Sequence, residues 1–529
     1  KLVALMLRFP QETYVKPGSV KSRSTTLPAP IGGLNARDSG ANMPAQDAVL
    51  LDNWFPRSTD VVSRGGCIEW NTFTGLCQSI LIYTGPTATK IFPCVKNGST
   101  YSIFEGTSSG ALSSPVVGGS GPTVQALTST RYDYAVFTTT GGTFLTAVNG
   151  ADTPLEYNGS AWSASGTTGG TPANYFTVGV YAKRLFYGVK DTFDVYYLAA
   201  DTKSGVATRL HLGALFKKGG SLNSIITVTD QAGELTDYIG FLSTQGEIAV
   251  FTGTDPATAA DWRLAAFFEI GYPVIKGNRC WAKRGSDAVV ICADGVYPLR
   301  KAIAAQNRSE GLSVSDKIRN LINADITVHG DRYGWQVMPF PKGTKMIVNV
   351  PTSEDRAAHQ YVMNTETGAW CRFTGWNAFV FEVARDTLYF GTNGAVFKAD
   401  TGYDDDDDPI FCDARQAYNY LGVRGRTKHV KLMQPVLTAN ADFAVGVSAD
   451  TDYVDRQVST LREQMAGAGD PWGGVWDVSW IGGAVVQSRW YSVPRIGDAI
   501  APRVKARVED GSLSWAATRV LYEMGGVVG

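Results

Sequence analysis

The stretch that decides the fold of this protein is Ile31–Glu69, which reads IGGLNARDSGANMPAQDAVLLDNWFPRSTDVVSRGGCIE. A polar segment rich in glycine and asparagine leads into a short amphipathic segment, then into an aromatic plug and a turn at Arg64–Gly66. Exposed tryptophan and phenylalanine need an apolar partner against which to bury. The pattern therefore predicts a segment that docks onto something and then feeds a β-rich body. Its expected docking residues are Leu51, Trp54, Phe55, Pro56 and Arg64.

The composition favours a β protein with many turns. Of the 529 residues, 44% are hydrophobic, 11% are aromatic and 58 are glycine, while only 18% are charged. Globular domains usually carry about 25% charged residues, and aromatic residues with glycine turns are typical of sheets rather than of helical bundles. The formal net charge of -1 provides no basic field that would hold nucleic acid tightly. We expect DNA, if it is a partner, to pass by without sequence-specific binding.

The cysteines and the apolar runs indicate the cellular compartment in which the chain is expected. The seven cysteines are scattered and no two are spaced C-x-x-C, so we expect buried reduced thiols rather than a disulfide framework. The apolar run Leu2–Leu7 is far shorter than the roughly 20 residues that cross a bilayer. We therefore expect neither a transmembrane span nor a signal peptide, although the first residue is Lys and the start can lie upstream.

The middle of the chain repeats a loose unit in which a polar residue and a glycine precede a strand with an aromatic residue. Asn-Gly and Asp-Gly are strong hairpin signals because both residues tolerate positive φ. In residues 360–402 the sequence predicts four strands with a turn at Asn364–Gly368, and Trp370, Phe373 and Trp376 as core bulk. Such strands suit propeller blades, and a set of β-sandwiches is the alternative. The five units are Asn97-Gly98, Asn158-Gly159, Gln245-Gly246, Asp294-Gly295 and Asn393-Gly394.

The predicted fold class is mainly β: a degenerate β-propeller-like body with an additional C-terminal β-domain and few short helices. Residues 1–65 form an expected N-terminal docking segment, residues 66–402 the body, and residues 403–529 the C-terminal β-domain. One helix is predicted over Val314–Ile326, where apolar residues recur at helical spacing, with Ser313 or Ser315 as its cap.

Two charged runs are candidate sites. The run Asp404–Asp408 is interpreted as a solvated loop at a domain boundary. The alternatives are a divalent-cation site with Asp404, Asp406 and Asp408 as candidate ligands, and part of an acidic ring in an oligomer. The run lacks the spaced D-x-D-x-D-G pattern of a calcium loop. Further on, Arg424, Arg426 and Lys428 form either a charged strand edge that blocks aggregation or a contact to an acidic partner or to DNA.

The aromatic stretch Pro471–Trp480 is a further candidate, in which Trp472 and Trp476 are either interface anchors or a platform for sugar rings. We favour the interface. The four histidines show neither metal nor triad spacing, and the chain has neither a G-x-S-x-G elbow nor a P-loop. The sequence thus predicts no enzyme and no cofactor, while a carboxylate pair of the glycosidase type stays an alternative.

The GGLN, LDNWFP and R-x-G elements of residues 31–69 resemble the opening of the tail-tube proteins of short-tailed bacteriophages, which are also called nozzle or packaged-DNA-stabilising proteins. The basic segment GVRGRTKHVK at residues 422–431 resembles the start of their closing β-domain. The resemblance covers both ends and the propeller-like middle of the chain. It lies in the general sequence pattern more than in exact motifs.

The resemblance implies a structural protein of the virion tail that is assembled in the bacterial cytoplasm. Six copies would form a ring below the portal and the adaptor, extend the DNA channel and retain the genome until ejection. The expected partners are other copies of the chain, the adaptor or head-to-tail connector, tail fibres or spikes, and genomic DNA in the lumen. The alternatives are a glycan- or receptor-binding propeller and a polysaccharide-degrading enzyme.

Overall fold

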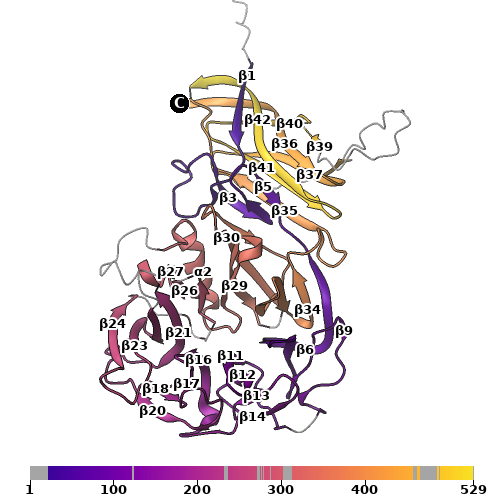
Figure 1. The fold of residues 1–529 in the computed structure, drawn as a ribbon. Helices are drawn as coiled ribbons and strands as arrows, with labels where there is room; N and C mark the ends of the chain where they lie inside the picture. The colour runs from indigo at the N-terminus through magenta and orange to yellow at the C-terminus, as the bar shows by residue number, and fades with distance from the viewer. Residues whose placement is uncertain are drawn as a thin grey trace, which may run out of the picture.

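The computed structural model describes residues 22–121, 124–230, 236–270, 275, 277, 279–285, 287–301, 313–354, 356–456, 461–464, 485–487 and 489–527. Most of these residues lie in strands. Figure 1 shows a ring of sheets at one end of the molecule and a domain of long strands at the other end, among them β36 (Arg426–Ala439) and β42 (Leu513–Val527). The chain is therefore mainly β, as its composition predicts.

Consecutive hairpins build the ring. The first sheets are β6 (Cys67–Thr84), β7 (Thr89–Asn97), β8 (Thr100–Ile103) and β10 (Val117–Gly118); β11 (Asp133–Thr139), β12 (Gly142–Val148), β13 (Leu155–Tyr157) and β14 (Trp162–Ala164); and β16 (Tyr175–Tyr181), β17 (Arg184–Val189), β18 (Asp194–Tyr197) and β20 (Thr208–His211). The fourth sheet consists of β21 (Leu222–Asp230), β22 (Thr236–Ser243), β23 (Glu247–Thr252) and β24 (Arg263–Glu269).

The next sheets are β25 (Trp281–Arg284), β26 (Asp287–Cys292) and β27 (Gly295–Pro298), and then β28 (Gln336–Phe340), β29 (Lys345–Ser353), β30 (Ala357–Asn364) and β31 (Trp370–Phe373). The last group is β32 (Val380–Ala384), β33 (Thr387–Gly391) and β34 (Asn393–Ala399), and it is completed by β6. Three short strands lie beside these sheets: β9 (Gly110–Ala111), β15 (Thr167–Thr168) and β19 (Gly205–Val206).

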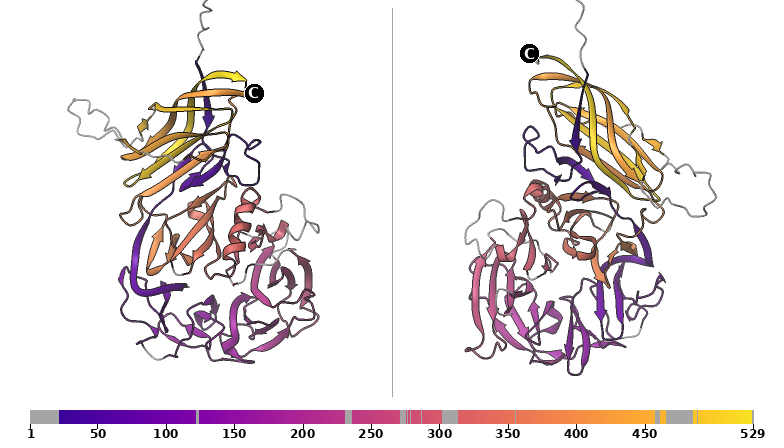
Figure 2. Two further views of the ribbon diagram at one scale, coloured as in Figure 1. Left: turned by 180° about the vertical axis from the view of Figure 1, so that it is seen from behind. Right: turned by 45° about the horizontal axis from the view of Figure 1, so that its top comes forward.

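The first strands of these groups contact one another in sequence and close the ring: β6, β11, β16, β21, β25, β28, β32 and again β6. Strand β6 serves two groups, because its first half pairs with β34 and its second half pairs with β7. Small sheets arranged radially, each contacting the next, define a β-propeller. The propeller-like body that the sequence predicts is thus present, and its closure depends on β6, which precedes every other strand of the ring in the chain (Figure 2).

The Gly-containing units lie at hairpin turns. All five precede or begin the second strand of an antiparallel pair, namely β7–β8, β13–β14, β22–β23, β26–β27 and β33–β34. Gly98, Gly159 and Gly295 have φ values of 58°, 95° and 145°, so a side chain there would be strained. The prediction for residues 360–402 needs correction, because the segment forms five strands, β30–β34, which are divided between two blades.

Helices are short and few in the described part of the chain: η1 (Pro172–Asn174), η2 (Asp316–Ile318), α2 (Arg319–His329), η3 (Pro341–Gly343) and the helical residues 299–301. The predicted helix is confirmed, but it begins and ends later than expected. Its expected caps are wrong, since neither Ser313 nor Ser315 caps it. The Ser313 hydroxyl donates to the Val296 carbonyl, and the Ser315 hydroxyl accepts from the Val296 N–H at 2.9 Å.

The other domain is built from both ends of the chain. One sheet contains β1 (Ser22–Pro28), β4 (Trp54–Pro56), β5 (Val61–Ser63), β36 (Arg426–Ala439), β39 (Val485–Gln487), β40 (Tyr491–Gly497) and β42 (Leu513–Val527). The other contains β2 (Gly33–Leu34), β3 (Asp47–Asp52), β35 (Ile410–Gln416), β37 (Phe443–Thr451), β38 (Arg462–Gln464) and β41 (Ile500–Val508), and it continues through β31 into the propeller.

This architecture corrects the prediction of a separate N-terminal docking segment over residues 1–65. Strand β1 pairs with β42 along its whole length, and β3 pairs with β35. A single buried cluster runs from Trp515 and Val520 in the β-domain to Trp370 and Phe390 in the blades. The described residues of the N-terminal segment are therefore an integral part of the β-domain, and a continuous core joins that domain to the propeller.

Candidate functional site

The buried side chain of Arg64 lies where the propeller meets the β-domain, and all five of its N–H donors are used. Its Nε donates to Asn53 Oδ1 at 3.0 Å, and its Nη1 and Nη2 donate to the two carboxylate oxygens of Asp405 at 2.8 and 2.5 Å. The remaining donors reach the carbonyls of Gly65 and Thr374. A buried guanidinium is tolerated when it is paired in this bidentate way. We call Arg64, Asn53, Thr374 and Asp405 the junction node.

Glycines make room for the junction node. A Cβ atom on Gly66 would lie 1.7 Å from the Asp404 carbonyl oxygen, and one on Gly375 would lie 2.8 Å from both Arg64 Nη2 and Asp405 Oδ2. Gly375 also has a φ of 102°, which L side chains rarely adopt. The Arg-Gly-Gly turn that stood out in the sequence is thus a place where two backbone segments approach closely.

Two further ion pairs connect the same parts of the chain. The Arg372 guanidinium on β31 binds the Asp52 carboxylate on β3 at 2.6 and 2.7 Å. Lys345 Nζ on β29 lies 2.8 Å from Asp400 Oδ2 and 4.7 Å from the centre of the Phe55 ring. These contacts hold the propeller, the N-terminal strands and the start of the C-terminal domain in one fixed arrangement.

The aspartate run is a tight turn at this junction. Asp405 and Asp408 form an antiparallel bridge, and Asp406 and Asp407 between them have φ values of 57° and 69°, as in the two-residue turns that favour Asp, Asn and Gly. The side chains diverge, since Asp405 binds Arg64 and Asp406 Oδ1 accepts from the Glu69 N–H. Across the described ranges, including all of Asp404–Asp408, no three acidic, His or Cys side chains are grouped to hold a metal ion.

The aromatic plug is buried by the chain itself. Leu51 and Trp54 are fully buried, Phe55 and Pro56 are also buried, and the Trp54 ring lies 5.9 Å from that of Trp515 on β42. The prediction that these four residues and Arg64 contact another protein is therefore corrected. The apolar and charged residues that they contact lie in the same chain.

The basic segment is divided between surface and interior. The side chains of Arg424 and Arg426 are exposed, and each donates to one backbone carbonyl, of Ala41 and Gly525 respectively. Lys428 is buried, and its Nζ binds the Asp498 carboxylate at 2.7 Å and the Asp498 carbonyl at 2.9 Å. Lys428 is thus corrected from a contact residue to a structural one. Trp472 and Trp476 lie outside the described residues.

A second polar cluster, which the sequence analysis missed, lies on the inner strands of the propeller. Asp133 Oδ2 accepts from Thr177 Oγ1 at 2.7 Å, and Tyr134 Oη donates to Glu382 Oε2 at 3.3 Å. Arg279 Nη2 donates to Ser79 Oγ at 2.9 Å. Residues from five different blades meet here, and no sequence signal links positions so far apart.

The two carboxyl groups of this cluster have unusual acidity. Burial raises the pKa of Asp133 to about 6 and that of Glu382 to about 7, although the nearby Arg279 opposes both shifts. Desolvation favours the neutral form of a carboxyl group. These two groups therefore carry less charge at neutral pH than surface carboxylates do.

A cavity of about 450 Å³ adjoins the junction node. Its walls combine the carboxylates of the aspartate turn with Arg356 and with the aromatic residues Phe379, Phe390 and Phe397. Along the described ranges, no helix is long and apolar enough to cross a membrane. The junction node is thus a fully paired joint between the propeller and the β-domain, and it lies beside this cavity.

Comparisons with known proteins find no matching family model and no matching curated protein. Solved structures do match. The computationally designed protein Ika8 shows 13% identity over 66% of this chain and 96% of its own, with a TM-score of 0.35. BBS1N, solved in complex with ARL6DN, shows 10% identity over 64% and 97%, with a TM-score of 0.37. BamB from Moraxella catarrhalis shows 13% identity over 66% and 94%, with a TM-score of 0.32.

Proposed function

We propose that this protein is a structural component of the tail of a short-tailed bacteriophage, the tail-tube or nozzle protein. Copies of the chain form a ring that extends the DNA channel below the portal and the adaptor, retains the packaged genome and then releases it. Fibres or spikes attach to this ring, and DNA passes through the lumen without sequence-specific binding. No catalytic residue is needed for this role.

One observation carries the proposal. The residues that resemble tail-tube proteins, 31–69, are the residues that join the propeller to the β-domain through Arg64, Asp52 and the buried Trp54. A tail component must transmit force between its attachment to the head and its distal end without bending internally. A continuous core with buried ion pairs at the joint supports such a role, because packed cores have low compressibility.

The exposed arginines support an interface with an acidic partner. Arg424 and Arg426 lie in the loop before β36 and at its start, and each makes a single hydrogen bond to a carbonyl. Exposed charges of this kind mainly steer association and set its salt dependence. We assign them to the contact with a neighbouring subunit or the adaptor.

The test is the mass of the native assembly, measured by mass photometry with and without the portal–adaptor complex. The proposal expects a six-fold ring of the 56.9 kDa chain, or a monomer that forms such a ring only on the adaptor. The variant R424E/R426E is expected to weaken assembly about tenfold, which corresponds to about 1.4 kcal/mol. The control R263E/K283E reverses two exposed charges on the propeller and should assemble normally. A monomer that ignores the adaptor would overturn the proposal.

A further inference from the structure

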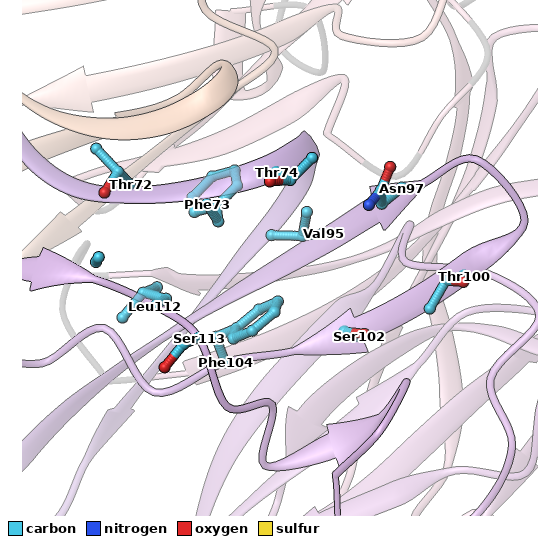
Figure 3. Close-up of a pocket in the computed structure, with 11 residues that line it drawn as sticks. Thr72, Phe73, Thr74, Val95, Asn97, Thr100, Ser102, Phe104, Leu112 and Ser113 are labelled. Carbon is cyan, nitrogen blue, oxygen red and sulfur yellow. The ribbon is translucent and has the colours of Figure 1, made fainter.

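A cavity of about 550 Å³ opens on the side of the propeller between β6, β8 and β9 (Figure 3). We call it the β6–β8 pocket. Figure 3 shows Phe73 from β6 and Phe104 from the segment after β8 on opposite sides of it, with Val95 of β7 between them. Its volume lies in the range of about 300–1,000 Å³ that is usual for small-molecule sites.

Hydrogen bonds hold the walls of this pocket in place. Trp70 Nε1 donates to the Gly106 carbonyl at 2.9 Å, and the amide of the buried Asn71 donates to the carbonyls of Ser108 and Gly110 at 2.7 and 3.2 Å. The Leu112 N–H donates to the Thr72 carbonyl at 2.8 Å. The segment after β8 is thereby fixed against β6, so the pocket is formed before a ligand arrives, which lowers the entropic cost of binding.

The polar side chains of the pocket have no partner in the protein. In the described part of the chain, none of the side chains that carry hydroxyl or amide groups here forms a hydrogen bond. Ser102 lies deepest among them, since only 7% of the residue is exposed, and its hydroxyl is free to bond to a ligand or to water. The unpartnered side chains are Thr72, Thr74, Asn97, Thr100, Ser102 and Ser113.

The chemistry of the lining restricts the ligand. No acidic or basic side chain among the described residues lines the pocket, so nothing there would neutralise a phosphate, a carboxylate or an ammonium group on entry. A sugar ring presents an apolar face of C–H groups and a rim of hydroxyls. The rings of Phe73 and Phe104 match the face, and serine and threonine hydroxyls, which both donate and accept, match the rim.

We propose that the β6–β8 pocket binds a neutral saccharide. Phe104 stacks on the sugar ring, and Ser102 and Thr100 bond to its hydroxyls from the floor and the rim. The proposal does not depend on a role in a phage tail, since it rests only on the propeller surface of a single chain.

The test uses saturation-transfer NMR on the full-length chain with glucose, galactose, N-acetylglucosamine, rhamnose and their disaccharides as probes, and glucose 6-phosphate and sialic acid as charged comparators. Binding to at least one neutral sugar with a Kd of about 1 mM is expected, as is typical of a site held by a few contacts. S102A and F104L should each weaken that binding about tenfold or more, whereas F104Y, which keeps an aromatic face, should bind as the parent does.

The matched control is S163A, which removes an exposed hydroxyl from β14 in the next blade, outside the pocket. Thermal unfolding of every variant shows whether the fold is kept, and the contrast between F104L and F104Y separates stacking from a packing effect. Three results would overturn the proposal: no binding of any neutral probe, binding of the charged comparators only, or binding that S102A and F104L leave unchanged.

Discussion

Burying a guanidinium group is unfavourable unless every donor finds an acceptor and the charge is paired. At Arg64 both conditions hold, because Asp405 supplies the charge, two carbonyls and Asn53 supply the other acceptors, and the Trp376 ring lies 5.0 Å from the guanidinium carbon. The sequence could mark Arg64 as part of a turn, but no pattern in it indicates that the side chain is interior, since arginine is rarely fully buried. Its partner is 341 residues away.

Removing this side chain should therefore destabilise the protein strongly. We expect R64A to lower the free energy of unfolding by about 3 kcal/mol, because it leaves the Asp405 carboxylate without its partner. Chemical denaturation followed by tryptophan fluorescence measures the change. R424A, which removes an exposed arginine, serves as the control and should change stability by less than about 0.5 kcal/mol. Equal effects of the two variants would contradict the structural role of Arg64.

The partly buried carboxyl groups of Asp133 and Glu382 in the inner-strand cluster make stability depend on pH. The pKa of Glu382 is 4.5 in its ordinary state and about 7 in the folded protein. Between these values the folded state holds a proton that the unfolded state has lost. The stabilisation is therefore complete below pH 4.5 and is lost as pH rises through 7. Asp133, whose pKa is raised to about 6, acts in the same direction.

The expected result is a fall in stability from about pH 5 to about pH 8 that becomes smaller in E382Q, by on the order of 2 kcal/mol. Glutamine keeps the acceptor for the Tyr134 hydroxyl and cannot ionise. Urea midpoints at the two pH values measure the effect, and E509Q, at an exposed position, is the control. An unchanged pH dependence in E382Q would show that Glu382 is already ionised at the lower pH.

At the scale of the elements, local signals predicted the hairpins well and their grouping poorly. The Asn-Gly and Asp-Gly turns follow from positive φ, which the residue type reveals directly. The division of β30–β34 between two blades depends on which strands become neighbours in space. The sequence of the turn at Asn364–Gly368 would be the same whether these strands formed one blade or two, so it does not indicate the division. Helix α2 was identified from its periodicity, but its start is fixed by contacts between Ser315 and β27 rather than by a cap.

The close approach of two backbone segments at Gly66 allows a prediction for the turn that contains this glycine. G66A should destabilise by about 2–3 kcal/mol, since the new Cβ atom would collide with the Asp404 backbone and the turn would have to move. G526A in β42 is the matched control, because a Cβ atom there would meet nothing within 4 Å. Thermal unfolding compares the two, and a mild effect of G66A would mean that the aspartate turn shifts easily.

At the scale of the whole molecule, the ring of blades is closed by the pairing of β6 with β34. Composition indicated a β protein and the repeated hairpins indicated a propeller, but no local pattern identifies which strand completes the last blade. The same holds for the N-terminal segment, whose apolar plug was recognised while the surface that covers it, Trp515 on β42, was not. Long-range pairing of this kind is a property of the topology rather than of any window of sequence.

A proline in the closing strand tests this topology. Strand β34 lies between β33 and β6, so the N–H of Lys398 faces a neighbouring strand whichever way it points. K398P removes that donor from a central strand, where proline is poorly tolerated. We expect a clear loss of stability, of about 3 kcal/mol, in urea denaturation. S163P in the edge strand β14 is the control and should lose much less; similar losses would argue against closure at β34.

The pairing of β1 with β42 also sets an order of events during synthesis. Ser22 lies opposite Glu523, and Cys67 lies opposite Ala399. At about 5–20 residues per second, the ribosome needs roughly 25–100 s to make a chain of this length, and for most of that time the first strands have no partner. The blades that precede β32 can form as they emerge, whereas the propeller can close only after β34 has appeared. Strand β1 and the exposed Trp54 have no partner until β42 has been made, so nascent chains need protection from aggregation at these strands.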